Sequence, residues 1–173
     1  PMYSNVATLG ARVLLPANRV AVFFLGEEPS SPGTARIACP TPAAELRSFQ
    51  VAGTTTFPAF RITTSQPVAA YDIYPYGGAA SAVASASLLL PTSAWSTVSV
   101  GVTPGPSLST YDPYLQVFAA EDATEVNIEA PVAITPGIGV VGSNARQVIP
   151  RMLRRGEVLQ LNQRAELGGS TIR

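Results

Sequence analysis

Residues 114–129 read YLQVFAAEDATEVNIE, and this stretch decides the fold class. The run 114–120 is rich in strand-forming residues. In the run 125–129 apolar and polar side chains alternate, and this period of two is the signature of a half-buried β-strand. Between them lies Glu121-Asp122-Ala123-Thr124, a good turn sequence because its acidic side chains can cap their own backbone. The stretch therefore predicts a β-hairpin. Its inward-facing side chains are expected to be Leu115, Val117, Val126 and Ile128.

The same alternation recurs along the chain in short runs. Residues 96–102 read STVSVGV, with three valines on one face and Thr and Ser on the other. A second hairpin is expected between residues 147 and 161, with its turn at Arg155-Gly156. Further strand candidates lie at residues 19–25, 34–38, 60–64 and 68–73.

Pro and Gly, the residues that most often interrupt helices, recur along the whole sequence. With 16 Pro and 14 Gly in the chain, long helices rarely survive. Only residues 81–90 hold enough Ala and Leu for a short helical turn, which Pro91 would end. About ten to twelve short strands with frequent turns argue for an all-β domain. We predict an antiparallel β-sandwich, with a barrel or a propeller-like arrangement as the alternative.

Composition narrows the possible chemistry. The chain has 173 residues, of which 13% are charged, and its formal charges cancel. The absence of His and Lys excludes Ser-His-Asp catalysis, imidazole ligands for zinc and Schiff-base chemistry within this chain. A neutral chain has no global field to draw it to nucleic acid or to an anionic membrane. No run is long and apolar enough to insert into a membrane, and no cofactor is expected.

Several motifs in this sequence resemble those of a known family. They are FRITTSQPVAAY at 60–71, YPYGG at 74–78, SLLLPTSAW at 87–95, LQVFAAEDATEVNI at 115–128 and RGEVLQL at 155–161. In this order they resemble the IgGFc-binding protein N-terminal domain family, in its bacterial, myxobacteria-like form, over residues 34–173. The resemblance implies an extracellular or cell-surface all-β module without known enzymatic activity. It carries no residue-level binding motif across to this chain.

The resemblance also bears on domain organisation. Residues 1–173 are expected to form one all-β module and to be a fragment of a longer IgGFc-binding-like region. In the family, the chain continues after the RGEVLQL strand into a further complete strand. This sequence stops at that point, at Thr171-Ile172-Arg173. A strand without its partner leaves an open edge, which can pair with flanking sequence or with another copy.

The aromatic-rich middle of the chain supplies the best ligand-binding candidates. Tyr74 and Tyr76, on a Pro/Gly loop, and nearby Trp95 suit contact with a ligand because they offer a large area and few torsions. The alternative is that these rings fill the core or cover the edge of the sandwich. Arg154 and Arg155 are secondary candidates for contact with an anionic group. Their alternative is the solvated rim of a turn.

The densest acidic group consists of Glu121, Asp122, Glu125 and Glu129, of which the first three are the candidate metal ligands. Carboxylate oxygens are the ligands that Ca²⁺ prefers, so a metal site is a weak alternative. The spacing matches no calcium loop, and a turn cap with a solvated strand face explains these residues better. No metal site and no catalytic residues are therefore predicted. The lone Cys39 is interpreted either as a buried small hydrophobe or as half of a disulfide with a Cys outside this chain.

These observations favour a recognition or adhesion module over an enzyme. Its expected place is secreted or at the cell surface, in association with an outer membrane. Its expected partner is a protein or a glycan at a cell surface or in the extracellular matrix. One alternative is a structural assembly unit of a surface layer or fibre. The least favoured alternative is a carboxylate-based glycan hydrolase, because no second acid can be placed across a cleft.

Overall fold

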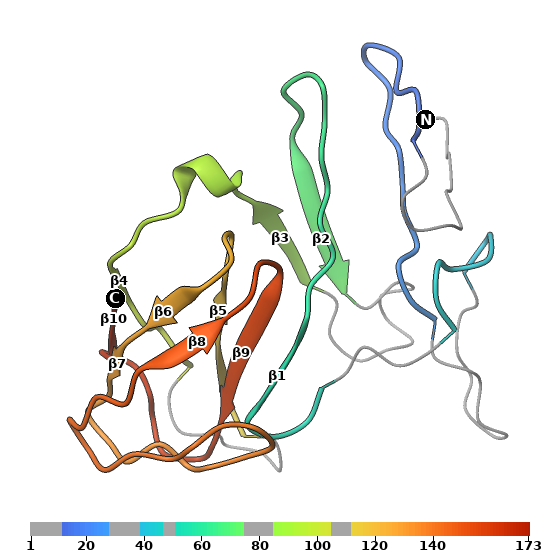
Figure 1. Ribbon diagram of the computed structural model, residues 1–173. Helices are drawn as coiled ribbons and strands as arrows, with labels where there is room; N and C mark the ends of the chain where they lie inside the picture. The colour runs from blue at the N-terminus through green and yellow to red at the C-terminus, as the bar shows by residue number, and fades with distance from the viewer. Residues whose placement is uncertain (1–11, 28–38, 47–50, 75–84, 105–111) are drawn as a thin grey trace, which may run out of the picture. The chain divides into compact units, whose positions relative to one another are not determined.

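The computed structural model describes residues 12–27, 39–46, 51–74, 85–104 and 112–173 (Figure 1). The regular elements of these residues are ten β-strands and one 3-10 turn. The strands form small antiparallel sheets of two or three strands, with no closed barrel among the described residues. The all-β class is therefore confirmed.

The chain divides into two compact units. The first comprises residues 1–51 and 69–89, and the second comprises residues 52–68 and 90–173. The expectation that residues 1–173 form a single module stays a prediction.

The first unit contains one regular ribbon. Strand β2 (Ala70–Tyr74) pairs antiparallel with β3 (Ser85–Leu89), in a register that sets Ala70 opposite Leu89. Within residues 85–89 the helical turn predicted over 81–90 is therefore wrong, and residues 81–84 lie outside the described part. The helix preference of Ala and Leu is a fraction of a kcal/mol per residue. The ladder with β2 satisfies the backbone of this segment and outweighs that preference.

The N-terminal part of the first unit is less regular. Of the strand predicted at residues 19–25, the structure shows only a parallel bridge just beyond it, between Gly26 and Glu45. Two adjoining backbone bonds support this bridge, from Ala44 N–H to the Phe24 carbonyl at 2.8 Å and from Glu45 N–H to the Leu25 carbonyl at 3.1 Å. The strand candidate at residues 34–38 lies outside the described residues.

Strand β9 (Glu157–Asn162) is the centre of the second unit. It lies between β1 (Thr55–Pro58) and β5 (Tyr114–Phe118), both antiparallel to it. A second sheet has the order β4 (Ser99–Val100), β10 (Thr171–Ile172) and β7 (Ile128–Glu129). The third joins β6 (Thr124–Val126) to β8 (Arg151–Leu153).

The core of the second unit lies where these sheets meet. Its most deeply buried apolar side chains are Ile128, Leu159, Leu161 and Leu167, each 0–1% exposed. Burying a side chain of this size contributes about 1.5–3 kcal/mol relative to leaving it in water. Of the inward positions predicted from residues 114–129, Leu115, Val126 and Ile128 are buried, and Val117 packs against the core while partly exposed. The inward set is therefore confirmed.

Both predicted hairpins are wrong in their pairing. The run 114–120 pairs with β9, and the run 125–129 splits between β8 and β10. At the second turn the chain passes from β8 to β9, which belong to different sheets. A good turn fixes the direction of the chain, whereas the pairing partner is chosen by the core that both strands bury. The run at 60–64 forms no strand, and only residues 99–100 of the run 96–102 do.

Candidate binding surface

Strand β5 separates an inner face from an outer face. Leu115 and Val117 point toward the core, so Tyr114, Gln116 and Phe118 lie on the opposite side of the strand. The Tyr114 side chain is 58% exposed and Phe118 is 47% exposed. Within the described residues, β5 pairs with β9 alone and is therefore an edge strand. Tyr114 and Phe118 therefore present partly exposed aromatic rings on the edge strand of a sheet.

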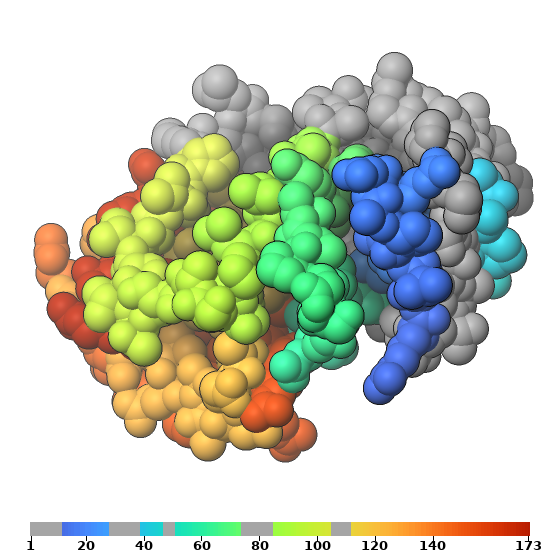
Figure 2. Space-filling view, turned by 90° about the horizontal axis from the view of Figure 1, so that it is seen from above, coloured from blue at the N-terminus to red at the C-terminus, as the bar shows by residue number. Residues whose placement is uncertain are grey.

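Trp95 extends this row of rings. It follows the 3-10 turn η2 (Thr92–Ala94), which begins after Pro91 and closes with a bond from the Trp95 N–H to the Thr92 carbonyl at 3.2 Å. The indole Nε1–H donates to the Leu90 carbonyl at 3.2 Å, which fixes the orientation of the ring. The segment 85–104, which carries η2, lies at the surface in the space-filling view (Figure 2). The turn and the hydrogen bond from the indole together hold Trp95 at this position.

The Trp95 and Phe118 rings contact each other edge to face. Their centroids are 6.3 Å apart and their planes meet at 64°. This is a favourable arrangement for two aromatic quadrupoles, typically worth about 0.5–1.5 kcal/mol beyond the area that is buried. Trp95 is still 42% exposed. We call Trp95, Tyr114 and Phe118 the aromatic surface.

A buried amide pair supports the middle of β5. The Gln116 Nε2–H donates to Gln160 Oε1 at 2.9 Å, and the Gln160 Nε2–H donates to the Gly53 carbonyl at 2.9 Å. Gln160 is only 2% exposed. Since a buried amide is costly without partners, these two hydrogen bonds tie together β5, β9 and Gly53, which lies two residues before β1. The aromatic surface therefore rests on a rigid base.

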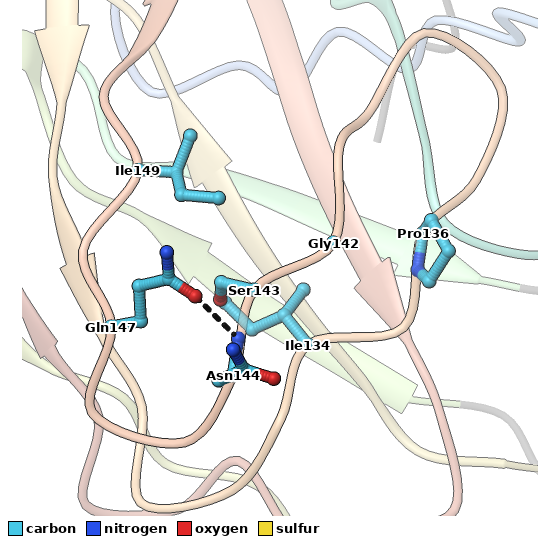
Figure 3. Close-up of a pocket in the computed structure, with 7 residues that line it drawn as sticks. All are labelled: Ile134, Pro136, Gly142, Ser143, Asn144, Gln147 and Ile149. Carbon is cyan, nitrogen blue, oxygen red and sulfur yellow. Dashed lines mark hydrogen bonds between the residues drawn. The ribbon is translucent and has the colours of Figure 1, made fainter.

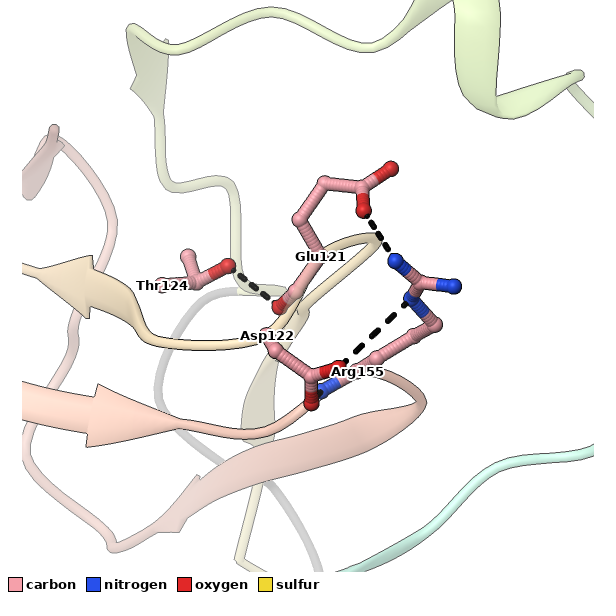
Figure 4. Close-up of polar contacts among 4 residues, drawn as sticks. All are labelled: Glu121, Asp122, Thr124 and Arg155. Atoms are coloured by element: carbon pink, nitrogen blue, oxygen red, sulfur yellow. Dashed lines mark hydrogen bonds and ion pairs between the residues drawn. The ribbon is translucent and has the colours of Figure 1, made fainter.

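A charged corner of Glu121, Asp122 and Arg155 adjoins the end of β5. The Arg155 Nη2–H donates to Glu121 Oε2 at 2.6 Å, and the Arg155 backbone N–H donates to Asp122 Oδ1 at 3.1 Å (Figure 4). The Thr124 hydroxyl donates to the Glu121 carbonyl at 2.7 Å and shapes the turn. Arg155 lies in the β8–β9 turn, so the corner joins two turns far apart in sequence. These side chains are largely exposed, and such pairs contribute about 0–1 kcal/mol each.

The residues of the weak metal alternative are engaged with protein groups. Glu121 and Asp122 face Arg155, and Glu125 Oε1 accepts a hydrogen bond from Asn127 Nδ2 at 2.7 Å. No group of three or more metal-ligating side chains occurs among the described residues. A guanidinium beside two carboxylates offsets the charge that would draw a cation. The corner is better explained as a structural contact between turns.

The other predicted site residues have different positions. Tyr74 is the last residue of β2 in the first unit, and Tyr76 lies outside the described residues. Arg154, in the β8–β9 turn, donates its backbone N–H to Glu157 Oε2 at 2.9 Å. Trp95, Arg154 and Arg155 belong to the second unit, with the aromatic surface. Phe118 was not singled out from the sequence, although its place opposite Leu115 and Val117 in the alternation indicates an outward ring.

Burial shifts two ionisable groups. It raises the pKa of the Cys39 thiol, and the neighbouring Glu27 carboxylate adds to the shift. The Cys39 backbone N–H donates to Glu27 Oε1 at 3.1 Å, so the two residues are held together. Burial also lowers the pKa of Arg151, whose Nη1 and Nη2 donate to the Ile149 and Val141 carbonyls, both at 2.9 Å. A raised pKa leaves less thiolate at neutral pH, so the Cys39 thiol is a weaker nucleophile than an unperturbed one.

An edge strand can accept an added strand from a partner, and aromatic residues are enriched at protein interfaces whose rim is polar. The family model described as IgGFc binding protein matches residues 85–173, just over half of the chain. The chain therefore belongs to the IgGFc binding protein family, a family of binding domains. The matched range contains the aromatic surface and the charged corner. That the likeness begins earlier, near residue 34, and is of the bacterial form stays a prediction.

No curated protein and no solved structure matches the chain. Among the described residues, no helix is long and apolar enough to span a membrane.

Proposed function

We propose that this chain is a non-enzymatic recognition module, secreted or at a cell surface, that binds a protein partner through the aromatic surface. The observation that carries the proposal is the exposure of Tyr114 and Phe118 on the edge strand β5 and of Trp95 in contact with Phe118. Tyr and Trp dominate the energetics of protein interfaces, and charged groups belong at their rim. The Glu121–Asp122–Arg155 corner has the composition of such a rim.

An edge strand adds a second means of contact. An extended segment of a partner can pair with the backbone of β5 while its side chains contact the exposed rings. Membership of the family supports a protein as the partner, since its description names one. The Fc part of IgG is therefore the first probe to use, and attachment to an outer membrane or to extracellular matrix belongs to the same proposal.

The proposal is tested with immobilised IgG Fc fragment, fibronectin, collagen and a mucin, against wild-type chain and the variants Trp95→Ala, Phe118→Ala and Tyr114→Ser. Loss of a central aromatic is expected to weaken binding by about 2 kcal/mol or roughly thirtyfold. Met152→Ala is the matched control, because Met152 is 59% exposed on β8 in the same unit. Thermal melting of each variant separates loss of contact from loss of fold.

Binding by the wild-type chain that the three variants lose, with melting temperatures close to that of the control, supports the proposal. No binding to any of the four proteins contradicts it. Equal binding by all variants contradicts the aromatic surface as the contact.

One observation favours the assembly alternative as a second candidate. In the register of β2 and β3, Tyr71, Ile73 and Leu88 share one face, and they are 62%, 63% and 55% exposed. An isolated two-stranded ribbon is marginally stable, so an uncovered apolar face favours association. Light scattering over a range of concentrations tests this candidate. A mass that rises with concentration and falls back in Tyr71→Ser supports assembly, and a constant monomer mass contradicts it.

A further inference from the structure

The segment between β7 and β8 forms a hollow of about 350 Å³ in the second unit. Its lining residues come from one stretch of chain (Figure 3): Ile134, Pro136, Gly142, Ser143, Asn144, Gln147 and Ile149. None of these side chains is charged. The hollow is separate from the aromatic surface in sequence and in the residues that form it.

The walls of the hollow are fixed by backbone pairing. Ile134 and Ser143 form an antiparallel bridge, with N–H to carbonyl bonds of 2.8 and 3.1 Å in the two directions. A side chain at Gly142 would lie 2.7 Å from the Ile134 carbonyl oxygen, so only glycine permits this close approach. The Asn144 N–H donates to Gln147 Oε1 at 3.0 Å and closes the turn beneath the hollow.

Two polar side chains brace this segment of the chain. The half-buried Arg151 donates to the carbonyls of Val141 and Ile149 at 2.9 Å each. Gln163, 5% exposed, accepts from the Thr135 N–H at 2.8 Å and donates to the Ala133 carbonyl at 3.0 Å. The geometry therefore exists before any ligand arrives, which reduces the entropy lost on binding.

The hollow offers unused hydrogen-bonding groups. Gln147 Oε1 accepts the Asn144 N–H, and within the part of the chain that the structure describes the two Gln147 Nε2 donors have no partner. The Asn144 carboxamide has no partner among the described residues and can both donate and accept. The exposed carboxamides of Asn144 and Gln147 can therefore offer hydrogen bonds to a polar occupant of the hollow.

From these groups we infer that the hollow binds one ring of a neutral sugar. Carboxamides satisfy sugar hydroxyls in both directions, and Ile134, Pro136 and Ile149 supply apolar contacts for the C–H groups of the ring. With no charge in the lining, an ionic ligand would lose hydration without a counter-charge. The volume lies at the low end of the range of about 300–1,000 Å³ for ligand pockets, which fits one ring rather than a long chain.

The inference is tested by NMR titration of the ¹⁵N-labelled chain with N-acetylglucosamine and with galactose. Saturable shifts of residues 142–149 with millimolar affinity are expected for at least one sugar. Sorbitol is the comparison ligand, because it has similar hydroxyls but no ring with an apolar face. We expect it to bind at least about fivefold more weakly, since its freedom is lost on binding.

Two variants and one control locate the site. Gln147→Ala and Asn144→Ala each remove hydrogen-bonding groups from the hollow, and each is expected to weaken binding about fivefold or more. Asn127→Ala is the matched control, because that carboxamide lies outside the hollow and already donates to Glu125. All three side chains are exposed or at the surface, so the fold is expected to persist, as the amide spectrum will show.

The inference is supported if the wild-type chain and Asn127→Ala show saturable shifts with similar affinity, and if Gln147→Ala and Asn144→Ala both bind the sugar more weakly. No saturable shift with either sugar overturns it, as does sorbitol binding equal to that of the sugars. Shifts confined to residues outside 134–149 also overturn it. A methyl glycoside tests the source of the sugar. If it binds with the same affinity as the free sugar, the ligand is the end of a glycan; if it binds more weakly, the ligand is the free sugar. None of these results bears on protein binding by the aromatic surface, so the two proposals fail separately.

Discussion

Gly137→Ala tests the most demanding contact of the second unit. A Cβ atom at this position would lie 1.8 Å from the Thr54 carbonyl oxygen, which is backbone and cannot turn aside. The same carbonyl accepts the Ile138 N–H at 3.0 Å, in the bridge that ties the loop to β1. To relieve the overlap, the loop must move away by roughly 1.5 Å, to ordinary contact distance.

That movement has two costs. The lost hydrogen bond is worth about 1 kcal/mol net, and the displaced packing adds about 1–3 kcal/mol. The free energy of unfolding is therefore expected to fall by about 2–4 kcal/mol. Gly139→Ala is the matched control, because Gly139 has φ of +71° and no atom within 4 Å of an added Cβ. Its cost is backbone strain alone, about 1–2 kcal/mol.

The assay is urea unfolding followed by tryptophan fluorescence, since the chain has one Trp, Trp95, and it lies in the same unit. The slope of the transition is expected to be unchanged, while the midpoint shifts further for Gly137→Ala than for Gly139→Ala. Equal or smaller destabilisation by Gly137→Ala would refute the close approach of this loop to Thr54.

Three more predictions follow from single contacts. Gln163→Leu leaves the Thr135 N–H and the Ala133 carbonyl unpaired and should lower the midpoint by an amount equivalent to about 2–4 kcal/mol, while the exposed Gln147→Leu should not. Arg155→Ala should cost less than about 1 kcal/mol and less still at high salt, because its partners are exposed; a large, salt-independent loss would contradict a rim position. For Cys39, the folded pKa lies above the ordinary value of 9.0, so its neutral form contributes stability that is lost as pH rises through the folded pKa. Alkylation by iodoacetamide near pH 9 should therefore be slow and should quicken in Glu27→Gln; no effect of Glu27→Gln would contradict the charge contribution.

The alternation within residues 114–129 predicted the faces of the strands correctly. Leu115, Val126 and Ile128 are buried because a period of two depends only on the local backbone. The pairing partners could not be predicted in the same way. Strand β5 finds β9 some 40 residues later in the chain, and no local signal encodes which distant strand completes the core.

The candidate surface shows the same division. Trp95 could be proposed as a contact residue from its residue type alone. The outward position of Phe118 follows from the alternation of side chains along β5. Their edge-to-face contact joins segments that only the tertiary fold brings together. The partner of Arg155 is a similar case, because Glu121 and Asp122 were interpreted separately from the arginines. The hollow between β7 and β8 depends on Arg151 and Gln163, which were not singled out from the sequence.

The residues 85–89 show how context overrides composition. Ser, Ala and Leu have no strong strand preference, yet the segment pairs along its whole length with β2. Tyr71 and Ile73 in β2 are good strand formers, and they lie opposite Leu88 and Ala86 of this segment. Propensity gave the wrong element here because it weighs a segment without its partner.

The central claim is that a protein partner binds at β5 and η2. Hydrogen–deuterium exchange of the chain, alone and saturated with whichever of the Fc fragment, fibronectin, collagen or mucin it binds, tests this most directly. The account predicts slower exchange in residues 92–95 and 114–118 on binding. Protection confined to β2 and β3, with β5 and η2 exchanging as in the free chain, would contradict it.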